Sequence, residues 1–323
     1  MNQEDEEEGF TSYSGYLLRR YGKRVYRVAV DAGFSCPNRG ANRNSPGCIY
    51  CDDFGARAAY LLDEPGHSTF NPPKVAEEIR KSIGFLRGRY GAEVFLLYLQ
   101  AFSNTHAPPV RLKEIYDFCL SQGPFSGLIV STRPDCVSKP VVELLSSYKE
   151  RGLEVWVELG LQSSRDETLL RINRGHTVAQ FLSAFNLLKE YQIPVAVHLI
   201  FGLPGEGWPE IRETILFLNS LNPEGVKIHN LTIPCKTPLG EEYLLGEIVP
   251  PGGRRHLENT IKALELLKKE IIVMRLTCDV PKSVLAGPRN FWKKGFFYDK
   301  VRKEMKKRKT WQGRLCGYVE RED

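Results

Sequence analysis

Short apolar runs alternate with amphipathic stretches along most of the chain. Runs typical of strands cover 24–31, 94–100, 127–131, 154–160, 195–201 and 225–231. Helical patterns cover the stretches near 74–90, 111–122, 138–151, 178–191 and 208–221. Several helical stretches begin with Pro and acidic residues and end at Gly, which are common helix boundaries. Strands and helices in this alternation predict a parallel sheet with right-handed crossovers.

The number of predicted strands decides the type of sheet. A closed eight-stranded barrel needs two further βα units, and the pattern does not provide them. We therefore predict an α/β fold, a partial (β/α)6 TIM-like barrel with N-terminal and C-terminal extensions. The predicted parts are an acidic and then basic extension at 1–23, a core domain at 24–245, and a helical, basic extension at 246–323.

The composition fits an enzyme domain with one large core. The chain has 323 residues, 42% of them hydrophobic, which is near the size of one α/β barrel with an appendage. Its eight cysteines are too few for a disulfide scaffold in a chain of this length. The segment Glu4–Glu8 is acidic, unlike a secretory signal or a transit peptide, and no apolar run is long enough to span a bilayer. We expect a soluble, cytoplasmic protein without a membrane partner.

Three cysteines follow the first predicted strand and form the most specific motif of the chain. Eleven residues separate Cys36 from Cys48, and Cys51 lies three positions further on. Three thiolates can hold a metal centre and leave one position open for a bound small molecule. The loop leaves the carboxyl end of a strand, where barrel enzymes display reactive groups. A zinc knuckle completed by His67 is the alternative. The other five cysteines are scattered singly, and we expect buried, small side chains there.

The cysteine motif, Cys-Pro-Asn-Arg followed by Gly-Cys-Ile-Tyr-Cys, resembles that of the radical S-adenosylmethionine (SAM) superfamily. The wide first gap resembles the YhcC/YtqA-like subgroup, whose radical SAM domain is Elongator-like. In the superfamily three cysteines, here Cys36, Cys48 and Cys51, bind a [4Fe-4S] cluster, and SAM chelates the fourth iron. The resemblance implies a partial barrel and a one-electron reductant such as flavodoxin or ferredoxin. It also implies a 5′-deoxyadenosyl radical that abstracts hydrogen from an unactivated carbon.

The resemblance also assigns SAM contacts to motifs at the ends of the later strands. These are a Gln-Ala-Phe loop, a Thr-Arg-Pro-Asp turn, the end of the fourth strand with the Asn-Arg-Gly-His loop, and a Gly-Leu-Pro-Gly-Glu turn. The expected contacts are Gln100, Thr132, Glu158, Gln162, Arg174, His198 and Gly202. Arg174 suits the SAM carboxylate because a guanidinium can donate two parallel hydrogen bonds to it.

Three of these motifs have a simpler structural interpretation. Glu158 lies within an apolar strand, where a carboxylate is costly unless it is paired, so it indicates either a polar cavity or a buried ion pair. His198 is either a ligand of the ribose or a satisfied core histidine. Asp135 is either part of the site or the cap of a helix.

The C-terminal extension is the strongest indication of a substrate. The net charge of the chain is +6, and ten Lys and Arg face two acidic residues between Lys293 and Arg314, with aromatic residues interleaved. Cations neutralise phosphates and aromatic rings stack on unpaired bases, so this segment is a candidate RNA contact. The candidate residues are Lys306, Lys307, Arg308, Lys309 and Trp311. An ordinary solvated helix is the alternative.

The family resemblance favours tRNA as the substrate. Members of the subgroup are linked to modification of wobble uridine, and the radical domain is of the kind used in tRNA acetylation. Radical chemistry on a small metabolite or a partner protein is one alternative, and a zinc-containing RNA-binding module without turnover is another. The sequence assigns no catalytic acid or base, and His106, in a loop, is the one candidate for a later step.

Overall fold

The computed structural model describes residues 8–39, 45, 47–52 and 69–317. His67, the fourth ligand in the zinc alternative, lies outside the described residues. Within the described part, no helix is long and apolar enough to cross a membrane.

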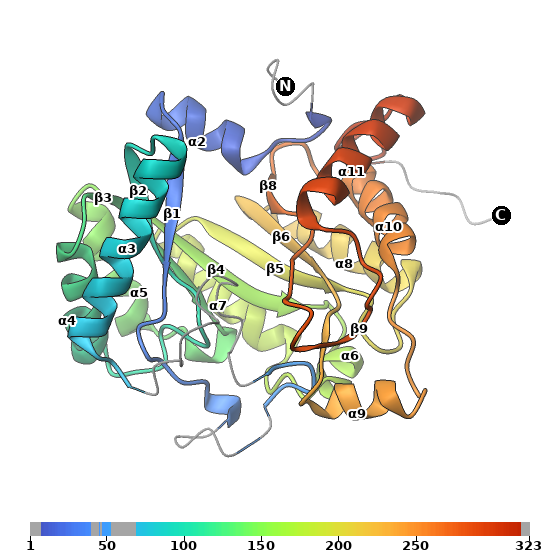
Figure 1. Cartoon of the computed structure of the whole chain (residues 1–323), viewed down its shortest axis with the longest axis horizontal. Coiled ribbons are helices and arrows are strands. Elements are labelled where there is room, and N and C mark those ends of the chain that lie inside the picture. Colours follow the sequence, from blue (N-terminus) through green and yellow to red (C-terminus); the bar gives the residue numbers. More distant parts are fainter. Residues whose placement is uncertain (1–7, 40–44, 46, 53–68, 318–323) are drawn as a thin grey trace.

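A curled, fully parallel sheet forms the centre of the molecule (Figure 1). Its seven strands stand in the order β1 (Val25–Val30), β2 (Val94–Leu99), β3 (Phe125–Thr132), β4 (Glu154–Gln162), β5 (Val195–Phe201), β6 (Gly225–Asn230) and β8 (Ile272–Arg275). The outer helices are α3 (Pro72–Tyr90), α4 (Pro109–Ser121), α5 (Lys139–Glu150), α6 (Asp166–Arg171), α7 (Val178–Glu190) and α8 (Trp208–Leu221). The partial TIM-like barrel is confirmed.

The predicted elements are confirmed to within two residues at each end. Their boundaries follow local chemistry, as in α3, where the Asn71 side chain accepts a hydrogen bond from the backbone of Lys74. Two prolines open this helix, and Gly91 ends it with a φ of 61°, a conformation that glycine adopts without strain. The strands are almost continuously apolar because both faces of a parallel sheet are covered.

The predicted number of six strands is wrong, because β8 adds a seventh. This strand comes from the predicted C-terminal extension and pairs in parallel with β6. It has only four residues, which is too short for an alternating pattern to distinguish it from the surrounding loop. A bridge between Ser12 and Val273 also ties the N-terminal extension to this edge. Two short strands, β7 (Ile233–Pro234) and β9 (Leu285–Gly287), form a separate antiparallel pair.

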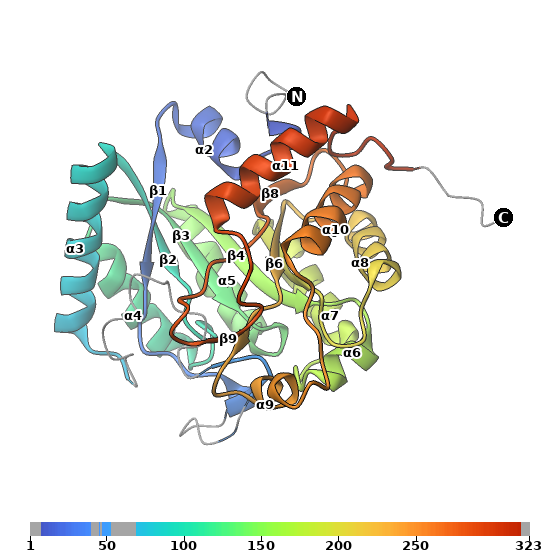
Figure 2. The ribbon, with the colours of Figure 1, turned by 45° about the vertical axis from the view of Figure 1, so that its right-hand side comes forward.

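Helices of the N-terminal extension, the end of the core domain and the C-terminal extension complete the molecule. At the N-terminus α2 (Tyr13–Tyr21) covers the amino ends of the strands, where Tyr16 and Tyr21 donate hydrogen bonds to Glu154 at the start of β4. The C-terminal helices are α9 (Pro238–Leu244), α10 (Gly253–Leu266) and α11 (Lys294–Arg308). Figures 1 and 2 place α2 at one end of the sheet and α9 at the other. The carboxyl ends of the strands lie at the α9 end.

Candidate cofactor and substrate site

Side chains inside the curled sheet change from apolar to polar along β4 and β5. Trp156 and Ala196 lie in an apolar cluster that packs against α2 at the amino ends. Two residues further along the same strands, Glu158 and His198 line a cavity. Alternate residues of a strand point to the same face, so the apolar cluster lies at the amino end of the sheet interior and the polar cavity lies next to it, toward the carboxyl ends. The cavity opens at the carboxyl ends of the strands.

The cavity brings together most of the side chains predicted for the cofactor site. It has a volume of about 270 Å³ and is lined by Cys36, Cys48 and Cys51. It is also lined by six predicted SAM contacts, which are Gln100, Thr132, Glu158, Gln162, Arg174 and His198. Gly202 is not among the lining residues. Its φ of +89° and the Pro251 ring, 2.2 Å from where a Cβ would lie, show that this glycine serves a close backbone approach.

The cysteine loop is held by hydrogen bonds to its own carbonyl groups and to a distant segment. The buried Arg39 donates to the carbonyl oxygens of Cys51 and Asp52. Asn38 donates to the carbonyl of Asn173 over 2.6 Å, and Asn173 donates back to the carbonyl of Gly47 over 2.7 Å. These bonds fix the thiols against the loop that follows α6.

The thiols do not surround a single metal ion. Among the described residues, no three His, Cys, Asp or Glu side chains converge as ligands of one ion. A structural zinc needs all its thiolates about 2.3 Å from one point. In a [4Fe-4S] cluster each cysteine binds a different iron, so the thiols stand further apart. All three thiols, Cys36, Cys48 and Cys51, line the same cavity.

Arg174 lies between the cysteine loop and β4. Its Nη1 is 3.6 Å from Cys48 Sγ, and its Nη2 donates to the Gly160 carbonyl over 3.1 Å. Burial alone would raise the pKa of the Cys48 thiol, but the positive charges of Arg174 and Arg133 lower it overall. Gly160 makes this approach possible, since a Cβ there would lie 2.5 Å from Arg174 Nη2 and 2.7 Å from Gln162 Nε2.

Several buried polar atoms of the cavity wall have no hydrogen-bond partner in the protein. They are Gln162 Oε1, Arg174 Nε, His198 Nε2 and Arg275 Nε. A buried polar atom without a partner costs free energy, so such atoms are rare except where a ligand satisfies them. Gln162 also has a φ of +75°, beside an irregularity in the pairing of β4 with β5. Backbone strain of this kind is concentrated at functional sites.

Glu158 is both a cavity residue and a member of a buried ion pair. Its Oε2 accepts hydrogen bonds from Lys227 Nζ at 2.5 Å, Tyr98 at 2.6 Å and Ser131 at 2.9 Å, and its Oε1 lies 3.3 Å from Arg27. Burial would raise the pKa of Glu158, but Lys227 and Arg27 lower it well below its ordinary value. Both interpretations of Glu158 therefore hold.

The sequence analysis missed Lys227, although it carries the same signal as Glu158, a charged residue inside an apolar strand. It also missed His229 and Arg275, which line the cavity from β6 and β8. The His198 and His229 ring centroids lie 4.1 Å apart, and Arg275 Nη1 lies 3.2 Å from His229 Nε2. Burial lowers the pKa of both histidines well below the ordinary value.

Two further motif residues are held by local hydrogen bonds, and one of them, Thr132, also lines the cavity. Thr132 accepts or donates hydrogen bonds with the hydroxyls of Ser103 and Thr105. Asp135 caps no helix, and its two oxygens accept hydrogen bonds from Arg133 at 2.8 and 3.0 Å. Among the five single cysteines, Cys119 is buried as expected, but Cys235 is exposed because it lies in the loop between β7 and α9.

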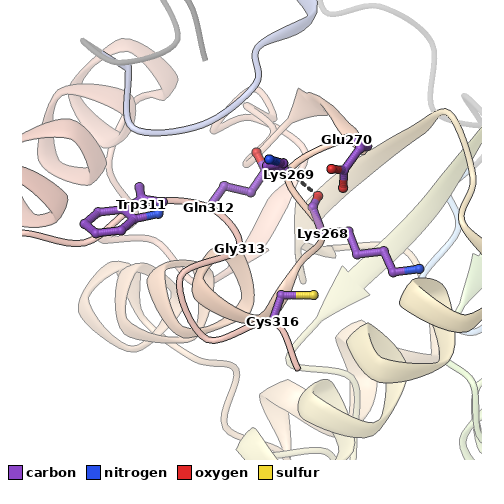
Figure 3. Close-up of a pocket in the computed structure, with 7 residues that line it drawn as sticks. All are labelled: Lys268, Lys269, Glu270, Trp311, Gln312, Gly313 and Cys316. Carbon is purple, nitrogen blue, oxygen red and sulfur yellow. Dashed lines mark hydrogen bonds between the residues drawn. The ribbon is translucent and has the colours of Figure 1, made fainter. Parts of the chain in front are cut away.

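The basic residues predicted to contact RNA lie far from the cavity. Lys306, Lys307, Arg308 and Lys309 are exposed at the end of α11, and Arg308 pairs with Glu258 and Glu304. Trp311, Gln312 and Cys316 line a shallow hollow of about 530 Å³ with Lys268, Lys269 and Glu270 (Figure 3). The last three residues precede β8, so this hollow is at the amino end of the sheet. The end of the basic segment thus lies at the amino end of the sheet, whereas its start reaches the cavity, where the backbone N–H of Lys294 donates to the cavity-lining Asp279.

Comparisons with known protein families agree with the cysteine motif. Residues 36–218 match the radical SAM superfamily, and residues 223–307 match the radical SAM C-terminal domain. YhcC of Escherichia coli is 34% identical over 279 residues, which cover 85% of each chain. YtqA of Bacillus subtilis is 31% identical over 316 residues, which cover 98% of this chain and 95% of YtqA. The chain is thus similar to these two proteins over nearly its whole length.

Two further matches are partial. A tRNA uridine(34) acetyltransferase of Methanocaldococcus infernus is 31% identical over 162 residues, which cover 49% of this chain and 29% of the acetyltransferase. The solved structure of Methanocaldococcus infernus Elp3, lacking its N-terminus, superimposes with a TM-score of 0.68 and 21% identity. That superposition covers 89% of this chain and 64% of the Elp3 chain. At this identity it supports the fold alone.

Proposed function

The chain belongs to the radical SAM superfamily, and from this premise we propose that it modifies tRNA at the wobble uridine. The family consists of enzymes that use a [4Fe-4S] cluster and SAM together with a reductant. When bound, these two groups supply the one-electron chemistry that removes a hydrogen atom from an unactivated carbon. For the reductant we infer a flavodoxin or a ferredoxin.

The described residues of the cavity fit both groups. Cys36, Cys48 and Cys51 would hold the cluster, which leaves one iron without a protein ligand. The unpartnered Arg174 Nε would donate to the SAM carboxylate, and Gln162 Oε1 would accept from an amino or hydroxyl group. These atoms lie in the wall of the same cavity as the thiols, so both parts of the cofactor site share one chamber.

The chain also supplies the surroundings that radical chemistry requires. The apolar cluster around Trp156, covered by α2, closes the lower end of the cavity and excludes water. Arg174 places a positive charge beside Cys48, which stabilises thiolate ligands. The residues that hold the cofactors thus come from the β1 loop, β4 and the loop after α6, and the strand order fixes their relative positions.

The observation that carries the tRNA assignment is the match to the tRNA uridine(34) acetyltransferase over about half of this chain. The basic surface at the end of α11, with the half-exposed Trp311, supports it because cations and free aromatic faces suit RNA. Strands of six to nine residues span roughly 20–30 Å, so a substrate that reaches both this surface and the cavity must be large. A folded tRNA meets that requirement.

One observation favours the alternative, a small metabolite or a partner protein as substrate. The basic surface and the cavity lie at opposite ends of the strands, so neither position requires the other. Under this alternative the basic surface would be a solvated helix. Copurifying tRNA distinguishes the two substrates, because a metabolite enzyme would carry none.

Nucleoside profiling of tRNA from a deletion strain tests the proposal directly. We expect loss of one modified uridine at the wobble position, restored by the wild-type gene and not by the Cys48→Ser variant. An unchanged nucleoside profile would reject tRNA as the substrate. It would leave the radical SAM chemistry intact, because iron content and SAM cleavage are measured on the purified protein.

A further inference from the structure

One wall of the cavity carries nitrogen-bearing side chains that the cofactor assignment does not use. We call Lys227, His229 and Arg275 the β6–β8 cluster. Lys227 and His229 are two residues apart on β6 and share its inner face, and Arg275 on β8 pairs in register with Lys227. All three line the cavity. Among the described residues no hydrogen bond joins the cluster to the cysteine loop, where Arg174 lies against Cys48.

The free hydrogen-bonding positions of this cluster are all donors. Arg275 Nη1 donates to His229 Nε2, and because a guanidinium can only donate, Nε2 accepts and the ring proton of His229 lies on Nδ1. Arg275 Nε is buried without a partner. Lys227 uses two of its three N–H groups on Glu158 and Tyr98. A ligand at this wall therefore meets three donors.

Buried cationic side chains outnumber buried carboxylates at this wall. Arg27 and Lys227 both lie against the single buried carboxylate of Glu158. Among the residues that the structure describes, Arg275 has no carboxylate at ion-pair distance, and its recorded polar contact is with His229. Asp279 also lines the cavity but is exposed, and its Oδ1 accepts the backbone N–H of Lys294. Burial, together with Arg275 and Arg27, lowers the pKa of Lys227 to about 7, whereas an anion beside it favours the ammonium form, as Glu158 does.

We propose that the β6–β8 cluster binds an oxyanion of the substrate, a phosphate or a carboxylate group. A guanidinium with a free Nε and a neighbouring ammonium match the oxygens of such a group, and charge-assisted hydrogen bonds are the strongest available. The anion would restore the charge balance of the wall. The inference rests on the proposed use of this cavity by SAM and its substrate. It does not depend on whether that substrate is tRNA.

The experiment measures anion binding to the reconstituted enzyme with SAM bound, under anaerobic conditions. The probes are inorganic phosphate, acetate, uridine 5′-monophosphate and uridine, titrated by calorimetry. We expect the wild type to bind the anions and to prefer uridine 5′-monophosphate or acetate over uridine. The Arg275→Gln variant should lose at least about tenfold in anion affinity, because it removes a charged donor. Preference for phosphate probes over acetate would identify a nucleotide, and the reverse a carboxylate.

Controls separate this subsite from the cofactor site. Arg275→Lys keeps the charge and should retain more anion affinity than Arg275→Gln, while Arg255→Gln, on the exposed face of α10, should change nothing. Iron content and SAM affinity should be equal in all variants. Equal anion affinity in the wild type and Arg275→Gln, or a parallel loss of SAM affinity, would overturn the proposal. If the enzyme binds anions but the nucleoside profile of tRNA from the deletion strain is unchanged, the anion subsite is supported and only the tRNA substrate is rejected.

Discussion

Arg174 Nη1 lies 3.6 Å from Cys48 Sγ, and this contact joins two motifs that are 126 residues apart in the chain. The same guanidinium reaches Gly160 at the end of β4 and leaves its Nε unpartnered. One side chain therefore links the thiols to the wall predicted to meet SAM. Cluster binding and SAM binding in this cavity can therefore be tested separately, with variants of the cysteines and of Arg174.

Replacing Cys36, Cys48 or Cys51 by Ala should abolish the cluster, because each thiolate binds a different iron. The expected result is loss of bound iron and of the broad visible absorption near 400 nm (roughly, as for thiolate–iron charge transfer). Cys278→Ala and Cys235→Ala are the controls, since the first changes another thiol of the cavity and the second an exposed one. Loss of the cluster in Cys278→Ala with retention in Cys36→Ala would contradict the assignment.

Arg174→Ala should weaken SAM binding by at least about tenfold, since it removes charge-assisted hydrogen bonds to the cofactor. Equilibrium binding of SAM to the reconstituted protein measures this change, and iron content should stay at the wild-type level. The control is Arg171→Ala, whose side chain pairs with Glu242 on α9 and does not line the cavity. Unchanged SAM affinity in Arg174→Ala would remove this residue from the site.

Glu158→Gln should destabilise the protein by roughly 3–5 kcal/mol, because it leaves Lys227 buried without its carboxylate. Denaturant unfolding measures the free energy, and the double variant Glu158→Gln with Lys227→Met should recover part of the loss. Glu114→Gln removes the exposed partner of Arg111 and should leave stability nearly unchanged. A double variant as unstable as Glu158→Gln would show that the pair itself is not the cause.

Buried His256 should make the protein less stable at acidic pH. Burial lowers its pKa to about 4, from an ordinary value of 6.5, although the hydrogen bond with the Leu276 carbonyl opposes this. A depressed pKa in the folded state contributes stability that is fully present above pH 6.5 and is lost as the pH falls toward 4. The loss amounts to at most about 1.4 kcal/mol per pH unit for one proton.

His256→Gln should flatten this part of the curve of unfolding free energy against pH. The matched control is His106→Gln, which replaces an exposed histidine and should keep the wild-type slope. The slope is the informative quantity, because His256 also packs against Phe291 and Phe297 and its loss lowers stability at every pH. An identical slope in the wild type and His256→Gln would contradict the prediction.

Neutralising Lys306, Lys307 and Lys309 together as Gln should reduce tRNA affinity by at least about tenfold, at ~1 kcal/mol or less per exposed contact. It should also flatten the dependence of binding on salt, since fewer counterions are released. Arg308 is kept, because its pairs with Glu258 and Glu304 make it part of the fold. Gel-shift titrations at several salt concentrations measure both effects.

The matched control for this variant neutralises Lys74, Arg80 and Lys81, which are exposed on α3. Cluster content and SAM cleavage without substrate should be unchanged in both triple variants. If tRNA binding survives the loss of the three lysines on α11, that helix is a solvated surface. A small metabolite would then be the better-supported substrate.

The elements of this protein and the chemistry of its first motif could be predicted from the amino-acid sequence alone. Apolar runs and amphipathic stretches predicted six strands and five helices to within two residues, because these patterns reflect which face of each element is buried. The cysteine motif and the turns after each strand predicted the radical SAM family. They did so because each motif is contiguous in the sequence.

Which residues contact one another depends on how the strands and loops pack in the folded protein. The pairing of Glu158 with Lys227, the partnership of His229 with Arg275, and the contact of Gly202 with Pro251 all join separate strands or loops. Sequence patterns show which side chains are buried, but register and loop closure choose their neighbours. For the same reason β8 was not predicted, because it becomes a strand of the sheet only by pairing with β6. The location of the basic end of α11 was not predicted either. Its charges are visible in the sequence, whereas its position at the amino end of the sheet follows from how α10 and α11 pack.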